Sequence, residues 1–154
     1  MNLTNNVIIG RQNIKKYKSN LATVKIKNAI KESESVISLF DVKTPNTNTL
    51  ATALSGGNQQ KFVVGRELED DPSLLIASQP TRGIDIGAQS LIWEKLRESR
   101  DNGLAVLLIS ADLEELIGLS DRIIVFYQGS MVKELNSANL SPEDLGGYMT
   151  GLKK

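Results

Sequence analysis

The sequence predicts an α/β fold with parallel strands flanked by helices. Three short, continuous apolar runs lead to this prediction, at Ser73–Ser78, Leu104–Ser110 and Arg122–Tyr127. Runs of this length without polar alternation are typical of strands covered on both faces, as in a parallel sheet. The α/β region therefore begins near residue 50, and we expect right-handed crossovers between its strands.

The first fifty residues differ in composition and predict a small helical layer. They are rich in Lys, Asn, Ser and Thr, and their apolar residues recur at helical spacing. The predicted apolar stripe consists of Leu21, Val24, Ile30, Ile37 and Phe40. A basic arm for nucleic acid is the alternative interpretation. Acids at Glu32, Glu34 and Asp41 interrupt the basic run, so we expect no nucleic-acid partner.

Helix signals separate and follow the predicted strands. Ala88–Arg100 carries apolar residues at helical spacing, and Asp112–Leu119 has acids in its first turn, where the helix dipole favours them. Another helix is predicted to begin at Ser141, where a capping residue, a proline and two acids follow one another. A turn at residues 128–129 leads into a last strand, Ser130–Leu135.

The composition excludes several kinds of site. The 18 basic and 18 acidic residues balance, so no global field attracts nucleic acid or acidic lipid. With no cysteine and no histidine, the chain has no thiolate, no disulfide and no imidazole base or ligand, and we expect no metal site. No apolar run approaches the ~20 residues of a membrane-spanning helix. Any membrane association is therefore expected to come through a partner.

The most specific stretch is LSGGNQQK, residues 54–61. It places a serine and two glycines at the start of a predicted helix that continues through residue 68. The glycines allow backbone amides to approach a ligand closely, Ser55 adds a hydroxyl, and a helix N-terminus presents unpaired N–H groups and positive potential. These groups suit phosphate oxygens. Taken alone, the pattern also fits an ordinary serine-capped helix.

LSGGNQQK resembles the signature motif of ATP-binding-cassette (ABC) ATPases, in the form found in importers of simple sugars and nucleosides. Further stretches follow in the order and spacing of that family. Residues 65–68 are similar to the end of the signature helix, residues 74–83 to the Walker B strand and residues 83–88 to the D-loop. Residues 107–116 are similar to the switch strand with its helix, and residues 120–132 to the terminal strands. The resemblance covers residues 50–150 well and residues 1–49 more loosely.

The resemblance implies a partial P-loop NTPase core, the C-terminal half of a nucleotide-binding domain and, we expect, of the second of two. The implied segments are 1–50, the end of a helical subdomain; 51–70, the signature motif and its helix; and 71–154, the rest of the core. No G-x-x-x-x-G-K-[ST] phosphate loop occurs in the sequence. ATP and Mg²⁺ are implied for the intact transporter, but we expect neither to bind tightly to this chain alone.

Three positions depart from the family's catalytic pattern. Ser78 and Gln79 align with the Asp-Glu pair that ends the Walker B strand, and Ala111 aligns with the switch histidine. In the family the first acid helps to bind magnesium through water, the second polarises the attacking water, and the histidine contacts the γ-phosphate. The neutral replacements predict a site that does not hydrolyse ATP. Drift in an inactive fragment is the alternative explanation.

The residues for a role in trans are retained. The resemblance implies that two domains pair head to tail, each signature closing over the nucleotide of the other. The residues predicted to bind nucleotide in this way are Ser55, Gly56, Gly57, Asn58 and Gln60. Gly83 and Asp85 of the D-loop are expected at the seam between the domains.

The favoured function is therefore the energy-coupling ATP-binding component of an importer for nucleosides or simple sugars. Its expected partners are the front half of the same domain, a second nucleotide-binding domain and membrane permease subunits, on the cytoplasmic side of the membrane. A non-catalytic ABC-like dimerisation module and a generic phosphate-binding domain are the alternatives. The ASQPTRG string at residues 77–83 resembles the nucleoside branch more than the sugar branch.

The missing front half has a consequence for the sheet. The resemblance implies that the phosphate-loop strand lies between the strand at Leu104–Ser110 and the strand at Arg122–Tyr127. Without it, unpaired edges remain, and exposed edges invite association. We expect these two strands to pair with each other, another chain to fill the gap through self-association, or the chain to be marginally stable.

Overall fold

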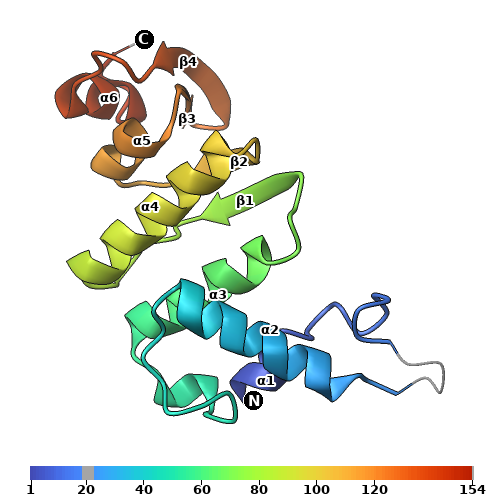
Figure 1. Ribbon diagram of the computed structural model, residues 1–154. Helices are drawn as coiled ribbons and strands as arrows, with labels where there is room; N and C mark the ends of the chain where they lie inside the picture. The colour runs from blue at the N-terminus through green and yellow to red at the C-terminus, as the bar shows by residue number, and fades with distance from the viewer. Residues whose placement is uncertain (19–22, 154) are drawn as a thin grey trace. The chain divides into compact units, whose positions relative to one another are not determined.

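The computed structural model describes residues 1–18 and 23–153, and it divides into two compact units (Figure 1). Unit 1 contains residues 1–75 and 80–105, and unit 2 contains residues 76–79 and 106–154. Leu21 of the predicted apolar stripe lies outside the described residues. The boundaries near residues 50 and 70 derive from the family resemblance and stay a prediction.

Unit 1 is helical. Its elements are α1 (Leu3–Asn6), α2 (Ile26–Leu39), a 3₁₀ turn (Ala51–Ala53), α3 (Gly56–Leu68) and α4 (Ile86–Asp101). The start of the chain is tied to the loop before the 3₁₀ turn, because Leu3 N donates to Thr49 O and Thr4 N to Thr47 O. The helices contact one another in the sequence α1, α2, α3, α4. None of the helices within residues 1–18 and 23–153 is long and apolar enough to cross a membrane.

The buried face of α2 differs from the predicted stripe. Val24 precedes the helix and is exposed, and Ile30 and Ile37 are only partly buried, although Phe40 is buried as expected. The fully buried positions of the helix are Ala29, Glu32, Ser33 and Val36. The prediction was wrong because two of these are polar residues, which an apolar pattern overlooks. Their hydrogen bonds make burial possible, since Ser33 Oγ donates to Ala29 O over 2.8 Å.

Unit 2 contains strands and two short helices. The strands are β1 (Leu74–Ser78), which begins in unit 1, β2 (Ala105–Ile109), β3 (Arg122–Tyr127) and β4 (Ser130–Asn136), and the helices are α5 (Leu113–Leu119) and α6 (Pro142–Met149). β1 pairs with β2, and β3 pairs with β4 in antiparallel register. Ala105 N donates to Ser73 O and Gln79 N to Ile109 O, so β1 and β2 run in parallel.

The core of unit 2 lies between the hairpin and its helices. Leu116 of α5, Leu145 of α6 and Ile123 and Val125 of β3 are buried together. The start of α6 is as predicted: Ser141 Oγ accepts from Asp144 N, Pro142 is the first helical residue, and the first turn is acidic. The α/β fold with parallel strands and flanking helices is confirmed.

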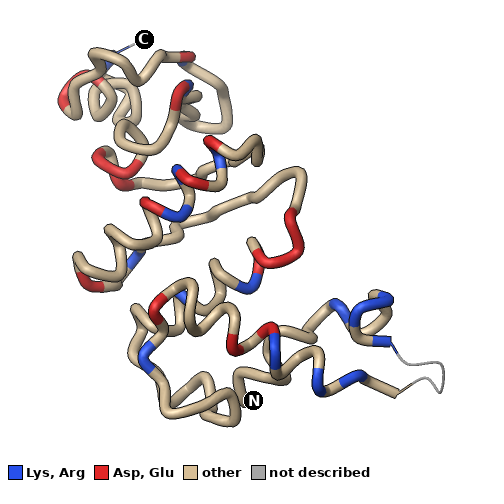
Figure 2. Tube along the Cα trace, in the orientation of Figure 1, with Lys and Arg blue, Asp and Glu red and all other residues tan. Residues whose placement is uncertain are grey.

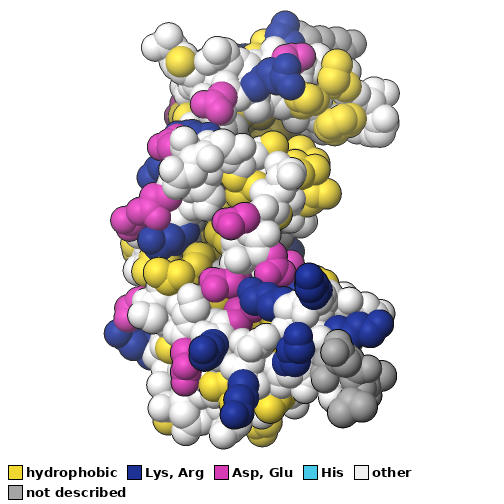
Figure 3. All heavy atoms as spheres, turned by 45° about the vertical axis from the view of Figure 1, so that its right-hand side comes forward, with side chains coloured by type: hydrophobic (Ala, Val, Ile, Leu, Met, Phe, Trp, Pro, Cys, Tyr) yellow, Lys and Arg dark blue, Asp and Glu magenta, His cyan; other side chains and the backbone are white. Residues whose placement is uncertain are grey.

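One of the three alternatives for the strands is excluded, and one expectation is wrong. β2 and β3 lie in separate two-stranded sheets, so they do not pair with each other, while self-association and marginal stability stay predictions. One face of the strands is also uncovered, with large apolar side chains 43–66% exposed (Figure 3). These side chains are Leu74, Ile76, Leu107, Ile109, Ile124 and Phe126. In unit 2, the described helices α5 and α6 pack against the alternate residues of β3, so the continuous apolar runs have a covering on one side only.

Helices α2 and α3 approach each other closely at Gly65. A Cβ atom on Gly65 would lie 2.6 Å from Phe40 Cδ2 and 2.8 Å from Val36 Cγ1, both shorter than a normal carbon–carbon contact. Glycine is therefore required for the two helices to pack at this distance.

Replacing Gly65 with alanine should lower the free energy of unfolding by about 1–3 kcal/mol, because the added methyl group overpacks the α2–α3 contact. Urea unfolding measures the change. Gly146→Ala in α6 is the matched control, since its Cβ would lie 3.7 Å from Leu113 Cδ1. In the control, stability should stay equal or rise by roughly 0.5–1 kcal/mol. Equal effects of the two substitutions would contradict the close approach.

Candidate functional site

The N-terminus of α3 carries the serine and glycines of the signature stretch. Ser55 is the N-cap residue: its backbone is extended, and its Oγ accepts from Asn58 N over 3.4 Å and from Asn58 Nδ2 over 3.0 Å. Ser55 and Gly56 are exposed, and Gly57 is buried. The first N–H groups of a helix lack intrahelical partners, so this end can donate hydrogen bonds to an anion.

Neighbouring side chains hold this turn in place. Asn58 Oδ1 accepts from Lys43 N over 2.9 Å, which ties the start of α3 to the segment that follows α2. Gln59 Nε2 donates to Leu54 O over 2.9 Å. Sequence reasoning assigned no role to Gln59, and only the position of an amide one turn from the cap could have suggested this bond. Gln60, predicted to bind nucleotide, is partly buried.

The D-loop residues lie against the start of α3. Asp85 is the N-cap of α4, and its Oδ1 accepts from Ala88 N over 2.9 Å. A Cβ on Gly57 would lie 2.8 Å from Asp85 Oδ2 and 3.0 Å from Ala88 Cβ, and one on Gly56 would lie 4.0 Å from Gly83 O. The structure thus brings together residues that are some 30 positions apart in sequence. We call Ser55, Gly56, Gly57, Gly83 and Asp85 the signature cluster.

The electrostatics of the signature cluster follow from these caps. The hydrogen bond from the Ala88 backbone is the main cause that holds the pKa of Asp85 below its ordinary value of 3.8. Asp85 is therefore a carboxylate at neutral pH, while the start of α3 favours negative ligands. An anion would bind at Ser55 and Gly56 on the exposed side of the turn.

The remaining predicted residues meet in unit 2, at the carboxyl ends of β1 and β2. Gln79 N donates to Ile109 O over 2.7 Å, which places Ser78 and Gln79 beside the segment that contains Ala111. Ser78 and Ala111 are exposed, and Gln79 is partly buried. We call Ser78, Gln79 and Ala111 the strand-end cluster.

The strand-end cluster offers no carboxylate ligand. Its three side chains are neutral, and Asp112, the residue after Ala111, uses its Oδ1 to accept from Glu115 N as the cap of α5. Across residues 1–18 and 23–153, no group of three or more acids, histidines or cysteines could hold a metal ion. The residues present therefore do not fit Mg²⁺ at this position, whereas the start of α3 fits phosphate oxygens.

Gln79 has an unusual backbone conformation. Its φ angle is +51°, in the left-handed region that residues other than glycine seldom adopt. Pro80 follows it, and the bond from Gln79 N to Ile109 O holds the strand end in place. The sequence did not indicate this conformation. Asp41, Asp71, Gln128 and Asn139 also have positive φ angles, so this conformation alone assigns no function to Gln79.

Comparison with known proteins identifies the relatives of the chain. It is 50% identical over 121 residues to the guanosine import ATP-binding protein NupO of Bacillus subtilis, covering 79% of this chain and 24% of NupO. It is 37% identical over 148 residues to the ribose import ATP-binding protein RbsA of Clostridium tetani, covering 96% and 29%. The chain is a homologue of the ATP-binding subunits of nucleoside and sugar importers. A scan against protein-family models finds no match.

Solved structures agree on the fold of this homologue. An inward-facing ABC transporter of the metal-chelate type matches with a TM-score of 0.76 at 16% identity, covering 97% of this chain and 59% of that one. A bacterial ABC transporter cassette matches with a TM-score of 0.71 at 22% identity, covering 89% and 57%. The fold is therefore part of an ABC ATPase cassette, and the predicted resemblance is confirmed. The chain spans 24–29% of the length of the two curated relatives above.

Replacing Asp85 with asparagine should make stability less dependent on pH. Asparagine can accept the same bond from Ala88 N but carries no charge. Because the folded-state pKa of Asp85 lies below 3.8, its carboxylate stabilises the fold above that pH and ceases to do so as the pH falls through the folded-state pKa. The wild type should therefore melt above Asp85→Asn at pH 7, and the difference should vanish near about pH 2.

Thermal melting at the two pH values tests this expectation. Glu94→Gln, at an exposed acid in the same helix, is the matched control and should show a smaller change between the two pH values. A melting difference between wild type and Asp85→Asn that stays constant from pH 7 to pH 2 would contradict it.

Proposed function

We propose that the chain is part of the energy-coupling, ATP-binding component of an importer, and that it acts through its signature cluster. The names of the relatives support the first half, since they are import ATP-binding proteins for guanosine and ribose. The capped N-terminus of α3 supports the second half, because its exposed Ser55 and Gly56 can donate hydrogen bonds to a phosphate oxygen. In this proposal the nucleotide is held by the phosphate loop of a partner domain.

The residues of the signature cluster and their neighbours Asn58 and Gln60 have distinct roles in this function. Ser55 Oγ and the first N–H groups of α3 contact the partner's nucleotide, and Gly57 allows α3 to start close to the D-loop. Asp85 caps α4 and lies at the seam between the domains. Asn58 holds the Ser55 hydroxyl, and Gln60 adds a neutral amide on the following turn. Each role uses preformed donors, which lose little freedom when the nucleotide arrives.

The strand-end cluster belongs to a second nucleotide site that binds without hydrolysis. Hydrolysis needs a base for the attacking water and a ligand for Mg²⁺, and neither Ser78 nor Gln79 is a carboxylate. Loss of general acid–base catalysis alone lowers turnover by roughly 10²–10⁴-fold. The result is an asymmetric pair in which this chain completes the working site of its partner.

The proposed assembly also includes the front half of the same domain, which covers the strands and carries the phosphate loop of the chain's own site. The uncovered apolar face of β1 and β2 and the separation of β2 from β3 support this part of the proposal. The matched cassettes also extend well beyond the region that this chain covers. The assembled component would sit on the cytoplasmic side of the membrane, bound to permease subunits. A nucleoside is the favoured solute, in line with the match to a guanosine importer.

Replacing Ser55 with arginine should abolish the ATPase activity of the transporter that contains this chain. The larger side chain blocks the exposed turn and removes the hydroxyl, so turnover should fall by roughly 10²-fold or more. Phosphate release from the reconstituted transporter measures the effect. Ser90→Arg, at an exposed serine of α4, is the matched control and should keep wild-type turnover. Wild-type turnover in Ser55→Arg would refute the role in trans.

The chain alone should bind no ATP in calorimetry with MgATP. Heat of binding should appear only after the phosphate-loop part of a cassette is added, and that mixture should release no phosphate, because the strand-end cluster has no base. Tight binding by the chain alone would instead favour a generic phosphate-binding domain.

A non-catalytic interaction module is the second candidate. The exposed apolar faces of the strands favour it, because large uncovered apolar patches mark interaction surfaces. This candidate requires dimerisation that does not depend on nucleotide. Sedimentation with and without MgATP in the presence of the phosphate-loop part distinguishes the two functions.

A further inference from the structure

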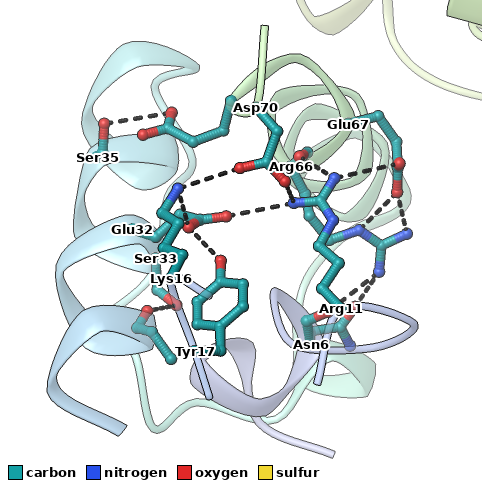
Figure 4. A network of polar contacts seen from close by, with 12 residues as sticks. Asn6, Arg11, Lys16, Tyr17, Glu32, Ser33, Ser35, Arg66, Glu67 and Asp70 are labelled. Atoms are coloured by element: carbon teal, nitrogen blue, oxygen red, sulfur yellow. Dashed lines mark hydrogen bonds and ion pairs between the residues drawn. The ribbon is translucent and has the colours of Figure 1, made fainter. Parts of the chain in front are cut away.

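A polar network surrounds Glu32 in the interface between α2 and α3 (Figure 4). The Glu32 side chain is only 1% exposed, and it accepts from the Tyr17 hydroxyl and pairs with Lys16 Nζ at 2.5 Å and Arg11 Nη1 at 3.3 Å. The Tyr17 hydroxyl is a donor at neutral pH, and burial and the neighbouring carboxylate raise its pKa further above the ordinary value. A buried charge with this many partners is costly to disturb, which makes the local geometry specific.

Arg11 connects this network to the end of α3. Its guanidinium is mostly buried, with the side chain 12% exposed. One nitrogen, Nη1, pairs with Asp70 at 3.1 Å as well as with Glu32. The other, Nη2, donates to Arg66 O over 2.8 Å and contacts Glu67 at 3.4 Å. A planar guanidinium holds its donors in a fixed fork, so one side chain fixes both distance and orientation.

The last turn of α3 is also held from the other side. Arg66 Nη1 donates to Asn6 Oδ1 over 2.9 Å and to Asn6 O over 3.3 Å. Basic residues gather in the segment before α2, and acids lie just after α3 (Figure 2). The N-terminal segment therefore fixes the C-terminal end of α3 through Asn6 and Arg11. An Arg side chain also stabilises the last carbonyls of a helix, which lack intrahelical donors.

These bonds hold the C-terminal end of α3, and the N-terminal end of the same helix carries the signature cluster. α3 has 13 residues, and at 1.5 Å per residue it is about 20 Å long. Between its ends, the contact with α2 at Gly65 is apolar and close, and such a contact limits distance more than rotation. The bond from Lys43 N to Asn58 Oδ1 holds the start of the helix, and the directional bonds of Arg11 add the constraint at its C-terminal end. A rotation of α3 at this end would shift Ser55 at the other.

We propose that Arg11 is a positioning residue for the signature cluster, because it fixes the C-terminal end of α3 to α2 and so sets the orientation of the helix start. Its importance for ATP hydrolysis rests on the proposed function in trans. The positional effect itself does not, and it can be measured in the chain without nucleotide.

Distance measurement between two spin labels tests the positional effect. The chain has no cysteine, so labels attach only at cysteines introduced at Lys27, exposed on α2, and Val63, exposed on α3. The labelled 154-residue chain should give a narrow distribution of distances. Arg11→Gln removes the charge and should broaden the distribution roughly two-fold, because the buried Glu32 loses a partner and the α3 end is released.

Two further variants complete the test. Arg11→Lys keeps the charge next to Glu32 but loses the forked geometry, and it should broaden the distribution less than Arg11→Gln. This milder variant decides the question if Arg11→Gln does not fold. Arg122→Gln, at an exposed arginine that pairs with Glu134, is the matched control and should leave the distribution narrow. Unchanged distributions in folded Arg11 variants would overturn the proposal.

The ATPase of the assembled transporter separates this inference from the proposed function. With the labels omitted, Arg11→Lys should lower kcat roughly ten-fold, since a misplacement of about 1 Å can cost up to 10²-fold, and should leave KM for ATP nearly unchanged. KM for ATP should stay nearly unchanged because the phosphate loop of the partner domain binds the nucleotide. If Arg11→Lys broadens the distribution but keeps normal kcat, and Ser55→Arg is fully active, the role in trans is refuted. The positional effect of Arg11 would stand in that case.

Discussion

The packing of unit 1 depends on two close approaches to a single helix, α3. At Gly65 the helix meets Val36 and Phe40 of the α2 region, and at Gly57 it meets Asp85 and Ala88 at the start of α4. Neither position has room for a Cβ atom, so both contacts require glycine. Gly57 therefore has a packing role that is independent of nucleotide. The start of α3 and the start of α4 are therefore coupled through this one residue.

Much of the fold follows from local patterns in the sequence. Ser55, Asp85, Asp112 and Ser141 each begin a helix with a side-chain cap, and each signal lies within a few residues of its helix. The strands also appear near the predicted positions. The buried face of α2 could not be predicted, because Glu32 is stabilised by Arg11 and Tyr17 from outside the helix. The members of the signature cluster were predicted individually. The contact between Gly57 and Asp85, which are nearly 30 positions apart, has no local signal in the sequence.

The signature cluster depends mainly on backbone groups, whereas the strand-end cluster depends on side chains. In the proposed function, the start of α3 acts through backbone N–H groups, the Ser55 hydroxyl and two glycines. The strand-end cluster lies on the exposed ends of β1 and β2, where side chains can change without disturbing the fold. In the proposed function, carboxylates there would contribute catalysis and little packing, so Ser78 and Gln79 at these positions leave the strands intact. The proposed loss of hydrolysis at this site would therefore be compatible with an intact start of α3.

The uncovered strand face gives a physical reason to expect a covering polypeptide. A sheet with one solvated face normally places polar residues there, alternating with the apolar ones. β1 and β2 instead place Leu74, Ile76, Leu107 and Ile109 on the exposed side. Burying a fully exposed side chain of this size contributes roughly 1.5–3 kcal/mol, and these side chains are 50–61% exposed, so covering each would add about half of that. The strands are therefore composed for burial on both faces, and within the described residues only one is covered. In the proposed function, the front half of the same domain would cover the other face, so nucleotide binding at the chain's own site and completion of the core would be one event.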